Sequence, residues 1–317
     1  MRLSVIIPTC NRNELLEETL LHLYESTRET DAEIIIVNDS KVQQAKIPDG
    51  APVPVRVLNN PMQGPGSARN LGAGIATGEL ILFLDDDILV NRAAILRTLA
   101  LHEAHPHSAL NLNWKYPDEL VEICHRTKFG RYLLHNRLDR YEGWVTGLDW
   151  KKTELFEVPK VAAFYLSISK SDFERVKGFD TAFIFQGAED TELSKRLVNA
   201  GIKLFVDPTV YVQHKETDRL TLKSRLNRTK ASAFNRRTAS DLGMKDYVIN
   251  HGKFKLLFYR FAINFKGLLI GMTNLVPNHR FFDFLYRRIV NMLIGISLYQ
   301  GYYLREKEMY SPEPNQR

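Results

Sequence analysis

The stretch Leu80–Asp87, LILFLDDD, places five apolar residues directly before three carboxylates. The apolar run predicts a buried strand, and an open α/β sheet binds its ligands at the carboxyl ends of its strands. Because neighbouring carboxylates repel each other unless a cation offsets their charge, the triplet predicts a site for a hard divalent cation. Alternation along a strand predicts that Asp85 and Asp87 point the same way. The alternative is a solvated acidic turn, which the apolar run before the triplet disfavours.

Strand and helix patterns alternate on both sides of this stretch. Short apolar runs predict strands at 3–8, 33–37, 53–58, 161–169, 203–206 and 209–212. Helical spacing of apolar residues predicts helices at 14–24, 68–76, 170–176 and 190–200. This alternation predicts an α/β fold with a mostly parallel sheet covered by helices on both faces. The segment 112–158 is aromatic and charged, and its weak periodicity assigns no element.

The composition is that of an ordinary globular protein, with 317 residues, 44% of them hydrophobic and 25% charged. Its two cysteines, Cys10 and Cys124, have no metal-ligand or redox spacing, which predicts reduced thiols in the cytosol. Strand-like residues begin at Leu3, so we expect no signal peptide. Residues 215–317 carry 19 Lys and Arg against 8 Asp and Glu, whereas residues 1–214 carry 24 against 29. The basic C-terminal region predicts an anionic partner: nucleic acid, a membrane surface or phosphates.

Two amphipathic helices are expected in the basic region. The first carries an apolar stripe at helical spacing, made of Phe254, Leu257, Phe258, Phe261, Phe265, Leu268, Leu269 and Met272. The second follows a break at residues 276–278 and carries Arg280, Arg287 and Arg288. Interleaved aromatic and basic residues are typical of helices at a membrane surface, and packing on the rest of the protein is an equal alternative. No uninterrupted apolar run reaches the ~20 residues of a spanning helix.

Five segments are motifs in a fixed order along the chain: SVIIPTCNR at 4–12, VNDS at 37–40, Gly64 with ARNLG at 68–72, FLDDD at 83–87, and GFD at 178–180 with GAED at 187–190. Together they resemble the family 2 glycosyltransferases over roughly residues 1–215. The resemblance implies the GT-A fold, with a Rossmann-like, mostly parallel sheet. Residues 1–110 would then form the nucleotide-sugar half and 111–215 the acceptor half, and 216–317 a helical extension.

The resemblance implies a metal-dependent, inverting transfer of a sugar from a nucleotide-diphosphate donor to a saccharide or lipid-linked acceptor in cell-surface glycan synthesis. UDP is the expected nucleotide because Asp39 suits the N3–H of uracil, although thymine presents the same edge. The common pattern has a carboxylate where this chain has Asn38. The stretch after Leu84 is also similar to that of galactofuranosyl- and rhamnosyltransferases, so the donor sugar stays open. The residues implied to bind the donor are Pro8, Thr9, Arg12, Asp39, Arg69, Asp85 and Asp86.

The resemblance also implies a metal site and a catalytic base. Asp85, Asp87 and His214 would hold Mn²⁺ or Mg²⁺, with imidazole favouring Mn²⁺, while Asp86 would point the other way in a supporting role. Asp190 would be the base that takes the acceptor's proton, and its place at the start of a predicted helix favours the ionised carboxylate. A purely N-capping acid is the alternative. The residues implied to contact the acceptor are Gln186, Gly187 and Glu189.

Alternatives remain open for several of these residues. Pro8 and Asp39 also suit simple turns, and Arg69 and His214 suit ordinary surface or structural positions. The basic residues after His214 either clamp the donor diphosphate or form a solvated helix; they are Lys215, Arg225, Arg228 and Lys230.

Two other functions compete with the enzyme: a nucleic-acid-binding module built on the basic region, and an inactive GT-A scaffold at a membrane. The first gives the acidic triplet no role, and the joint presence of Asp87, Asp190 and His214 argues against the second. We therefore expect a cytoplasmic enzyme with no nucleic-acid partner. Its residues 253–304 would lie at the inner face of the cell membrane, over the acceptor cleft or in a homodimer interface.

Overall fold

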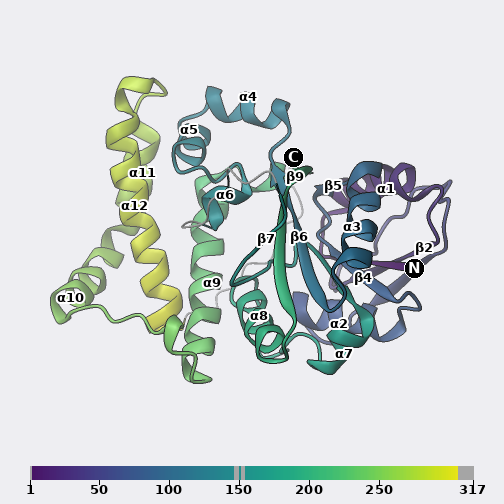
Figure 1. Ribbon diagram of the computed structural model, residues 1–317. Helices are drawn as coiled ribbons and strands as arrows, with labels where there is room; N and C mark the ends of the chain where they lie inside the picture. The colour runs from purple at the N-terminus through teal and green to yellow at the C-terminus, as the bar shows by residue number, and fades with distance from the viewer. Residues whose placement is uncertain (1, 146–149, 151–153, 306–317) are drawn as a thin grey trace.

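The computed structural model describes residues 2–145, 150 and 154–305, and these residues form one nine-stranded sheet with helices on both faces (Figure 1). The strand order is β3-β2-β1-β4-β8-β6-β9-β5, and β7 pairs with β9. In the first half, β1 (Leu3–Thr9), β2 (Ala32–Asn38), β3 (Val55–Asn59) and β4 (Leu80–Leu84) are parallel. The β2 and β4 strands are buried along their whole length, which explains why β4 is apolar throughout and β2 is apolar from Ile34 to Val37.

Helices α1 (Asn13–Thr27), α2 (Pro65–Ile75) and α3 (Arg92–Ala104) connect and cover the parallel strands. One buried carboxylate, that of Glu33 in β2, joins the strand to its neighbours. It accepts hydrogen bonds from Ser4 in β1, from Thr77 and from Arg56 in β3. Burial alone would raise the pKa of Glu33, but these hydrogen bonds lower it to about 2.

The second half of the sheet is mixed. Strand β8 (Tyr165–Ser169) is antiparallel to β4 and to β6 (Ser108–Lys115), and β9 (Lys203–His214) is parallel to β6. The two short strands expected at 203–206 and 209–212 are this one strand, whose pairing shifts register opposite Leu112 and Asn113. Short strands β5 (Ile88–Leu89) and β7 (Phe156–Glu157) pair antiparallel with β9.

The segment that sequence periodicity left unassigned contains the end of β6 and three helices, α4 (Asp118–Arg126), α5 (Lys128–His135) and α6 (Tyr141–Trp144). Part of it, residues 146–149 and 151–153, lies outside the described residues. Two further helices, α7 (Lys170–Arg175) and α8 (Glu189–Asn199), flank the loop that leads into the GAED motif, whose last two residues begin α8. Each expected helix of residues 1–215 is therefore present within a few residues of its predicted bounds.

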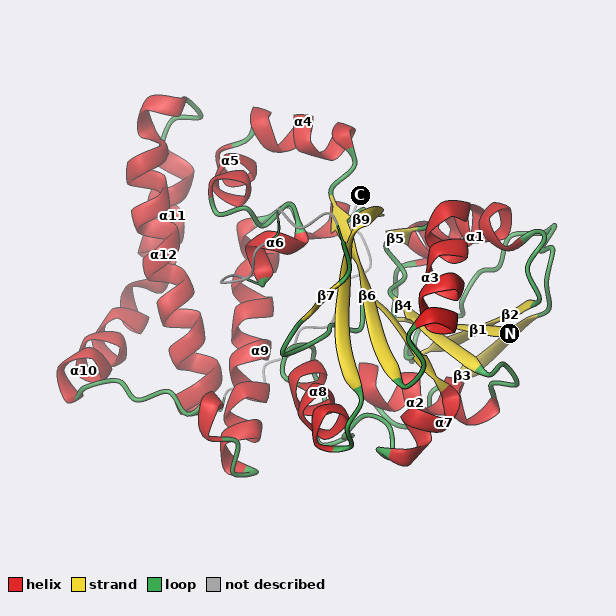
Figure 2. Cartoon of the chain, in the orientation of Figure 1, coloured by secondary structure: helices red, strands yellow, loops and turns green. Residues whose placement is uncertain are grey.

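Past β9 the chain is helical (Figure 2). Its helices are η1 (Thr217–Arg219), α9 (Leu222–Asp241), η2 (Lys245–Tyr247), α10 (Lys253–Ala262), η3 (Ile263–Phe265), α11 (Lys266–Leu275), η4 (Arg280–Phe282), α12 (Asp283–Tyr299) and the π-helical turn η5 (Gln300–Leu304). Buried residues of α9 and α12, including Leu226, Val290 and Leu293, belong to the same hydrophobic core as the sheet. The predicted C-terminal helical extension is confirmed, and the domain boundary at residue 215 stays a prediction.

The segment Lys253–Leu275 combines α10, η3 and α11 and is 23 residues long, with a mean hydropathy of 1.2. By length and composition alone it is apolar enough to cross a membrane. This differs from the expectation drawn from uninterrupted apolar runs, because scattered Lys and Arg residues interrupt the run without ending the helix.

Candidate active site

Most of the predicted site residues lie where β1, β2, β4 and β9 end, and two groups of charged side chains meet there. Strand β4 stops at Leu84, and the chain turns at Asp86 and Asp87. The backbone N–H of Asp85 donates to the carbonyl of Phe164 at 3.0 Å, which holds the start of the turn against the neighbouring chain.

Arg12 joins two members of the acidic triplet. Its Nη1 donates to Asp86, and its Nη2 donates to Oδ2 of Asp87 at 2.6 Å. Asp86 also accepts a hydrogen bond from Thr9 Oγ1 at 2.7 Å, and its burial raises the pKa of its carboxyl to about 6 against the opposing charge of Arg12. The prediction that Asp86 points away from Asp87 is wrong, because the turn after Leu84 ends the alternation of the strand.

Asp87, His214 and Glu216 form a buried group whose ligand atoms all lie within 4.8 Å of one another. His214 Nε2 is 3.2 Å from Asp87 Oδ1, but neither atom makes a hydrogen bond to any residue that the structure describes. Trp114 packs edge-on against the imidazole, with ring centroids 4.7 Å apart. Two carboxylates and one imidazole, in which Asp87 Oδ1 and His214 Nε2 make no hydrogen bond to a described residue, fit a divalent cation such as Mn²⁺. Glu216 was not predicted; its spacing of two residues from His214 at a strand end is the signal that could have identified it.

Guanidinium groups surround this buried group. Arg219 donates to Glu216 Oε1 at 2.5 Å, with its Nη1 3.5 Å from Asp87, and Arg228 donates to the same Glu216 oxygen at 3.2 Å. Burial alone would raise the pKa of Asp87, but the charges of Arg12, His214 and Arg219 hold it well below its usual range. Burial opposes protonation of His214, yet Glu216 and Asp87 raise its pKa.

Of the predicted basic clamp, the structure brings Arg228 to this group, whereas Lys215 pairs with Glu18 on α1. Arg225 lies over the ring of Trp144, 5.4 Å from its centroid. The role of Lys230 in this clamp stays a prediction.

A second group forms around Arg69, which is buried in α2. Its Nη2 donates to Asp85 Oδ1 at 2.7 Å, and its Nη1 is 3.9 Å from Glu189 Oε1. Asp190 adds a further negative charge near the same guanidinium. Asp85 therefore pairs with Arg69 in this structure, and the Asp87 group contains Glu216 in the place predicted for Asp85.

Asp190 is the second residue of α8, after Ala188 as the N-cap, so it is not itself the capping residue. Glu189 Oε2 accepts hydrogen bonds from the backbone N–H groups of Gly187 and Ala188 instead. Burial raises the pKa of Asp190, while Arg69 and a hydrogen bond from the backbone N–H of Ala163 oppose the rise. Burial and the charge of Asp190 raise the pKa of Glu189 to about 8. Arg69 stabilises the ionised form of both carboxyls, so each is a candidate proton acceptor.

Two family models match the chain and together cover both groups. The model described as "Glycosyl transferase family 2" matches residues 4–160, and the one described as "N-terminal domain of galactosyltransferase" matches residues 154–219. The chain belongs to the family 2 glycosyltransferases.

Relatives of this glycosyltransferase include the validoxylamine A glucosyltransferase of Streptomyces hygroscopicus subsp. limoneus, 29% identical over 230 residues that cover 64% of this chain and 49% of the relative. The pre-mycofactocin glycosyltransferase of Mycobacterium tuberculosis is 27% identical over 219 residues, covering 67% of this chain and 42% of that one. The chain therefore spans about half the length of the curated relatives it matches.

Two solved structures confirm the GT-A fold. The mannosyltransferase PcManGT from Pyrobaculum calidifontis, in complex with GDP-Man and Mn²⁺, has a TM-score of 0.55 at 16% identity, covering 96% of this chain and 88% of that one. Residues 1–349 of S. aureus TarS, in complex with UDP-GlcNAc, have a TM-score of 0.51 at 16% identity, covering 98% and 93%. At these identities the likeness concerns the fold alone.

The predicted nucleotide-binding residues lie at the ends of β1 and β2. Pro8 and Thr9 end β1, and Asp39 follows β2. Both carboxylate oxygens of Asp39 accept a hydrogen bond, from Asn60 at 2.7 Å and from the backbone N–H of Gly64 at 3.1 Å. Because a carboxylate oxygen accepts more than one hydrogen bond, Asp39 keeps acceptor capacity for a base.

The predicted acceptor residues differ in exposure. Gln186 and Gly187 are exposed, whereas Glu189 is buried beside Arg69. Helix α9 braces their loop, since Asn235 donates to the carbonyl of Phe185. Gly187 has φ +95°, and a Cβ added there would lie 2.7 Å from Ser232 Oγ on α9, so this position requires glycine.

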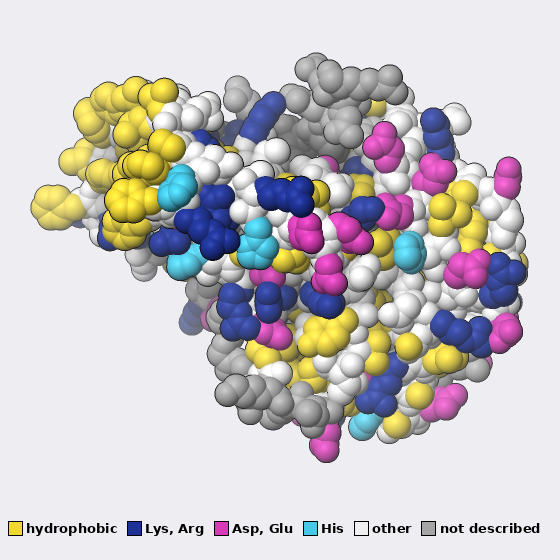
Figure 3. All heavy atoms as spheres, turned by 90° about the horizontal axis from the view of Figure 1, so that it is seen from above, with side chains coloured by type: hydrophobic (Ala, Val, Ile, Leu, Met, Phe, Trp, Pro, Cys, Tyr) yellow, Lys and Arg dark blue, Asp and Glu magenta, His cyan; other side chains and the backbone are white. Residues whose placement is uncertain are grey.

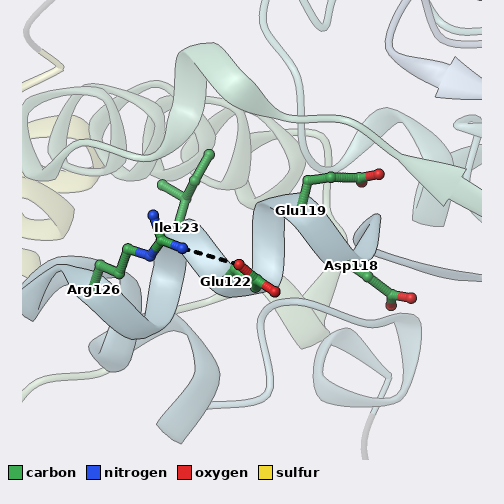
Figure 4. Close-up of a pocket in the computed structure, with 5 residues that line it drawn as sticks. All are labelled: Asp118, Glu119, Glu122, Ile123 and Arg126. Carbon is green, nitrogen blue, oxygen red and sulfur yellow. Dashed lines mark hydrogen bonds and ion pairs between the residues drawn. The ribbon is translucent and has the colours of Figure 1, made fainter.

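An open pocket lies on α4, away from these groups (Figure 4). It is lined by Asp118, Glu119, Glu122, Ile123 and Arg126, with Arg126 and Glu122 paired at 3.0 Å. None of the predicted site residues lines it.

Proposed function

We propose that this glycosyltransferase transfers a sugar with inversion from a nucleotide-diphosphate donor, with UDP-sugars as the first choice, to a saccharide or lipid-linked acceptor in cell-surface glycan synthesis. The observation that carries the proposal is the meeting of two charged groups at one edge of the sheet. One is the buried group of Asp87, His214 and Glu216, and the other contains Asp85 and Asp190 around Arg69. We place the enzyme in the cytoplasm at the inner face of the cell membrane.

The donor proposal draws on the structural neighbours, one solved with GDP-Man and Mn²⁺ and the other with UDP-GlcNAc. Asp39 would accept the N3–H of a uracil base, and Pro8 and Thr9 would line its side of the pocket. Thr9 and Arg12 already hold Asp86 in place through hydrogen bonds, so their proposed role is to position the acidic turn. Arg219 and Arg228 would stabilise negative charge on a diphosphate bound at Asp87.

Asp87, His214 and Glu216 would hold Mn²⁺ or Mg²⁺, with Asp85 as the further candidate ligand. A bound cation would offset the charge that develops on the departing nucleoside diphosphate. Trp114 packs edge-on against the His214 ring and would hold its orientation for the cation.

Asp190 would accept the proton of the attacking acceptor hydroxyl. Burial raises the pKa of this carboxylate and makes it a stronger base, while the charge of Arg69 opposes the rise. Its Oδ1 is buried and accepts no hydrogen bond from a described residue, so this oxygen has capacity for the acceptor hydroxyl. Gln186 and Gly187 would contact the acceptor from the exposed loop before α8.

A thermal-shift panel of UDP-, dTDP- and GDP-sugars, each with and without Mn²⁺ or Mg²⁺, tests the proposal. A ligand at about 100 times its Kd stabilises the folded state by about 2.7 kcal/mol. For a chain of this size we expect a rise in Tm of about 4 °C with a UDP-sugar, only when the cation is present. A panel in which no nucleotide sugar shifts Tm at any cation concentration would refute the proposed function.

A further inference from the structure

The outer face of the helical extension is apolar and exposed. Its most exposed members are Phe254, Leu257, Phe261, Leu268, Leu275 and Phe281, whose side chains are between 62% and 91% exposed. The first five recur at intervals of three, four or seven residues, so they share one face of α10 and α11, and Phe281 follows in η4. We call these six residues the apolar face. Figure 3 shows hydrophobic side chains gathered over this part of the molecule, with Lys and Arg side chains along their border.

The charge around the apolar face has one sign. Residues 253–304 contain seven Lys and Arg and one acidic residue, Asp283. Asp283 is neutralised by Arg131 of α5, which donates to both of its carboxylate oxygens at 2.8 Å. The exposed cations Lys253, Lys255 and Arg260 are therefore offset by no acid of their own segment.

We propose that the apolar face is a docking surface for an anionic lipid bilayer, on which α10 and α11 lie parallel to the membrane plane. Large apolar side chains flanked by cations match the acyl boundary and the anionic headgroups of a bilayer at the same time. A second copy of this chain fits less well, since a two-fold interface brings each patch against itself and sets the exposed cations of α10 near those of the second copy.

The inner side of the same helices keeps them on the protein. Tyr259 of α10 stacks on Tyr299 of α12 with ring centroids 6.0 Å apart, and Thr273 of α11 is buried. A spanning orientation would pull α10 and α11 off α12 and place Arg260 and Lys266 in hydrocarbon, which is strongly unfavourable. The helices therefore lie on the surface of the bilayer.

The docking surface is fixed to the acceptor half of the enzyme. Lys128 of α5 donates to the carbonyls of Thr273 and Val276 at 2.6 and 2.7 Å, which caps the end of α11. Tyr132 donates to Asn291 of α12 at 2.9 Å, beside the paired Arg131 and Asp283. A bilayer bound at the apolar face thus sits at a fixed position relative to the acceptor half, as a membrane-linked acceptor requires.

Vesicle flotation of the full chain tests this proposal without any nucleotide or transfer activity. The probes are vesicles of phosphatidylcholine alone and of phosphatidylcholine with about 30% phosphatidylglycerol. We expect flotation with the anionic vesicles at low salt and release near 1 M salt, where the Debye length falls to about 3 Å. Absence of flotation with anionic vesicles would overturn the proposal and would leave the thermal-shift response to UDP-sugars untouched.

Matched variants distinguish binding through the apolar face from nonspecific adsorption to vesicles. The double variant Phe254→Gln and Phe261→Gln should lower partitioning by about tenfold for each phenylalanine. The control pair Leu21→Gln and Leu96→Gln removes two apolar side chains that are each 48% exposed on the catalytic body, and it should float like the unmodified protein. An equal loss of vesicle partitioning in the two double variants would overturn the proposal.

The charge contribution has its own matched pair. Lys253→Gln with Lys255→Gln should weaken binding to anionic vesicles and flatten its salt dependence. The control pair, Lys177→Gln with Lys203→Gln, removes two exposed lysines elsewhere and should change neither. Two further results would refute surface docking. Retention of the protein in the vesicles after alkaline carbonate treatment would indicate a spanning helix. A doubled molecular mass in solution that Phe254→Gln with Phe261→Gln abolishes would indicate a dimer interface.

Discussion

Replacing Asp190 by asparagine tests the proposed base with little change to its surroundings. Asparagine has the size of aspartate, and its carbonyl oxygen still accepts the backbone N–H of Ala163. The substitution removes the group that accepts the proton, an effect that general base catalysis puts at about 10²- to 10⁴-fold in rate. That corresponds to about 3–5 kcal/mol on the activation barrier. We therefore expect turnover to fall by that factor, while the Kd for the donor changes only a few-fold.

The pH dependence of kcat is a second, independent test of the proposed base. A base acts only when deprotonated, so kcat of the unmodified enzyme should rise with pH through the pKa of Asp190, which burial raises. This rise of kcat with pH should be absent in the Asp190→Asn variant. The variant should also lower the pKa of Glu189, because the charge of Asp190 contributes to its raised value of about 8.

The assay measures kcat and KM with the nucleotide sugar that gives the largest thermal shift, together with donor affinity by calorimetry. Glu189→Gln is the matched control, since glutamine still accepts the backbone N–H groups of Gly187 and Ala188. Its turnover should fall less than that of Asp190→Asn. Unchanged turnover of Asp190→Asn, or a loss confined to donor affinity, would refute the assignment and make Glu189 the first alternative base.

Three further predictions concern the cation site, the acidic core and the loop after β3. Asp87→Ala should abolish transfer and most of the Mn²⁺-dependent part of nucleotide binding, and Glu216→Gln should weaken the Mn²⁺ dependence; near-normal turnover of Asp87→Ala with the same Mn²⁺ response would show that the cation binds elsewhere. Glu33→Gln should lower the free energy of unfolding by about 3 kcal/mol at pH 7, measured in urea. Because the folded pKa of Glu33 is about 2 and its ordinary value 4.5, this stabilisation is complete above pH 4.5 and is lost as pH falls toward 2, so a gap that stays constant down to pH 3 contradicts it. Gly64→Ala should destabilise the fold by about 1–3 kcal/mol, because Gly64 has φ +109° and an added Cβ would lie 3.0 Å from the carbonyl oxygen of Ile184; an unchanged Tm would contradict this strain.

The parallel half of the fold could be predicted because its signals are local. Strand β4 is an unbroken apolar run and β2 is apolar from Ile34 to Val37, each run is followed by a polar residue, and burial on both faces of the sheet explains that pattern. Most motif residues fall at strand ends or helix starts, as expected for an α/β sheet that binds ligands at its edge, and the ARNLG motif lies inside α2. The elements of segment 112–158 could not be predicted for the opposite reason. Its short helices pack on residues far along the chain, as Arg131 does on Asp283.

The sequence predicted most residues of the candidate site, but only some of the contacts between them. Arg12 is 74 residues from Asp86 in sequence, and Glu216 is 129 residues from Asp87, so no local pattern reveals either pairing. The alternation rule also failed at the acidic triplet, because it holds only while the chain remains a strand. Tertiary geometry therefore decides which carboxylate meets which cation.

The three consecutive carboxylates have three different sets of partners because the chain turns immediately after β4. Asp85 pairs with Arg69, which also lies beside the proposed base Asp190. Asp87 faces His214 at the end of β9, and Asp86 between them is held by hydrogen bonds from β1 and from Arg12. The proposed cation ligand and the neighbour of the proposed base are thus two residues apart on one turn. A substitution that moves this turn displaces both at once, which explains why the middle carboxylate is buried and anchored on both of its oxygens.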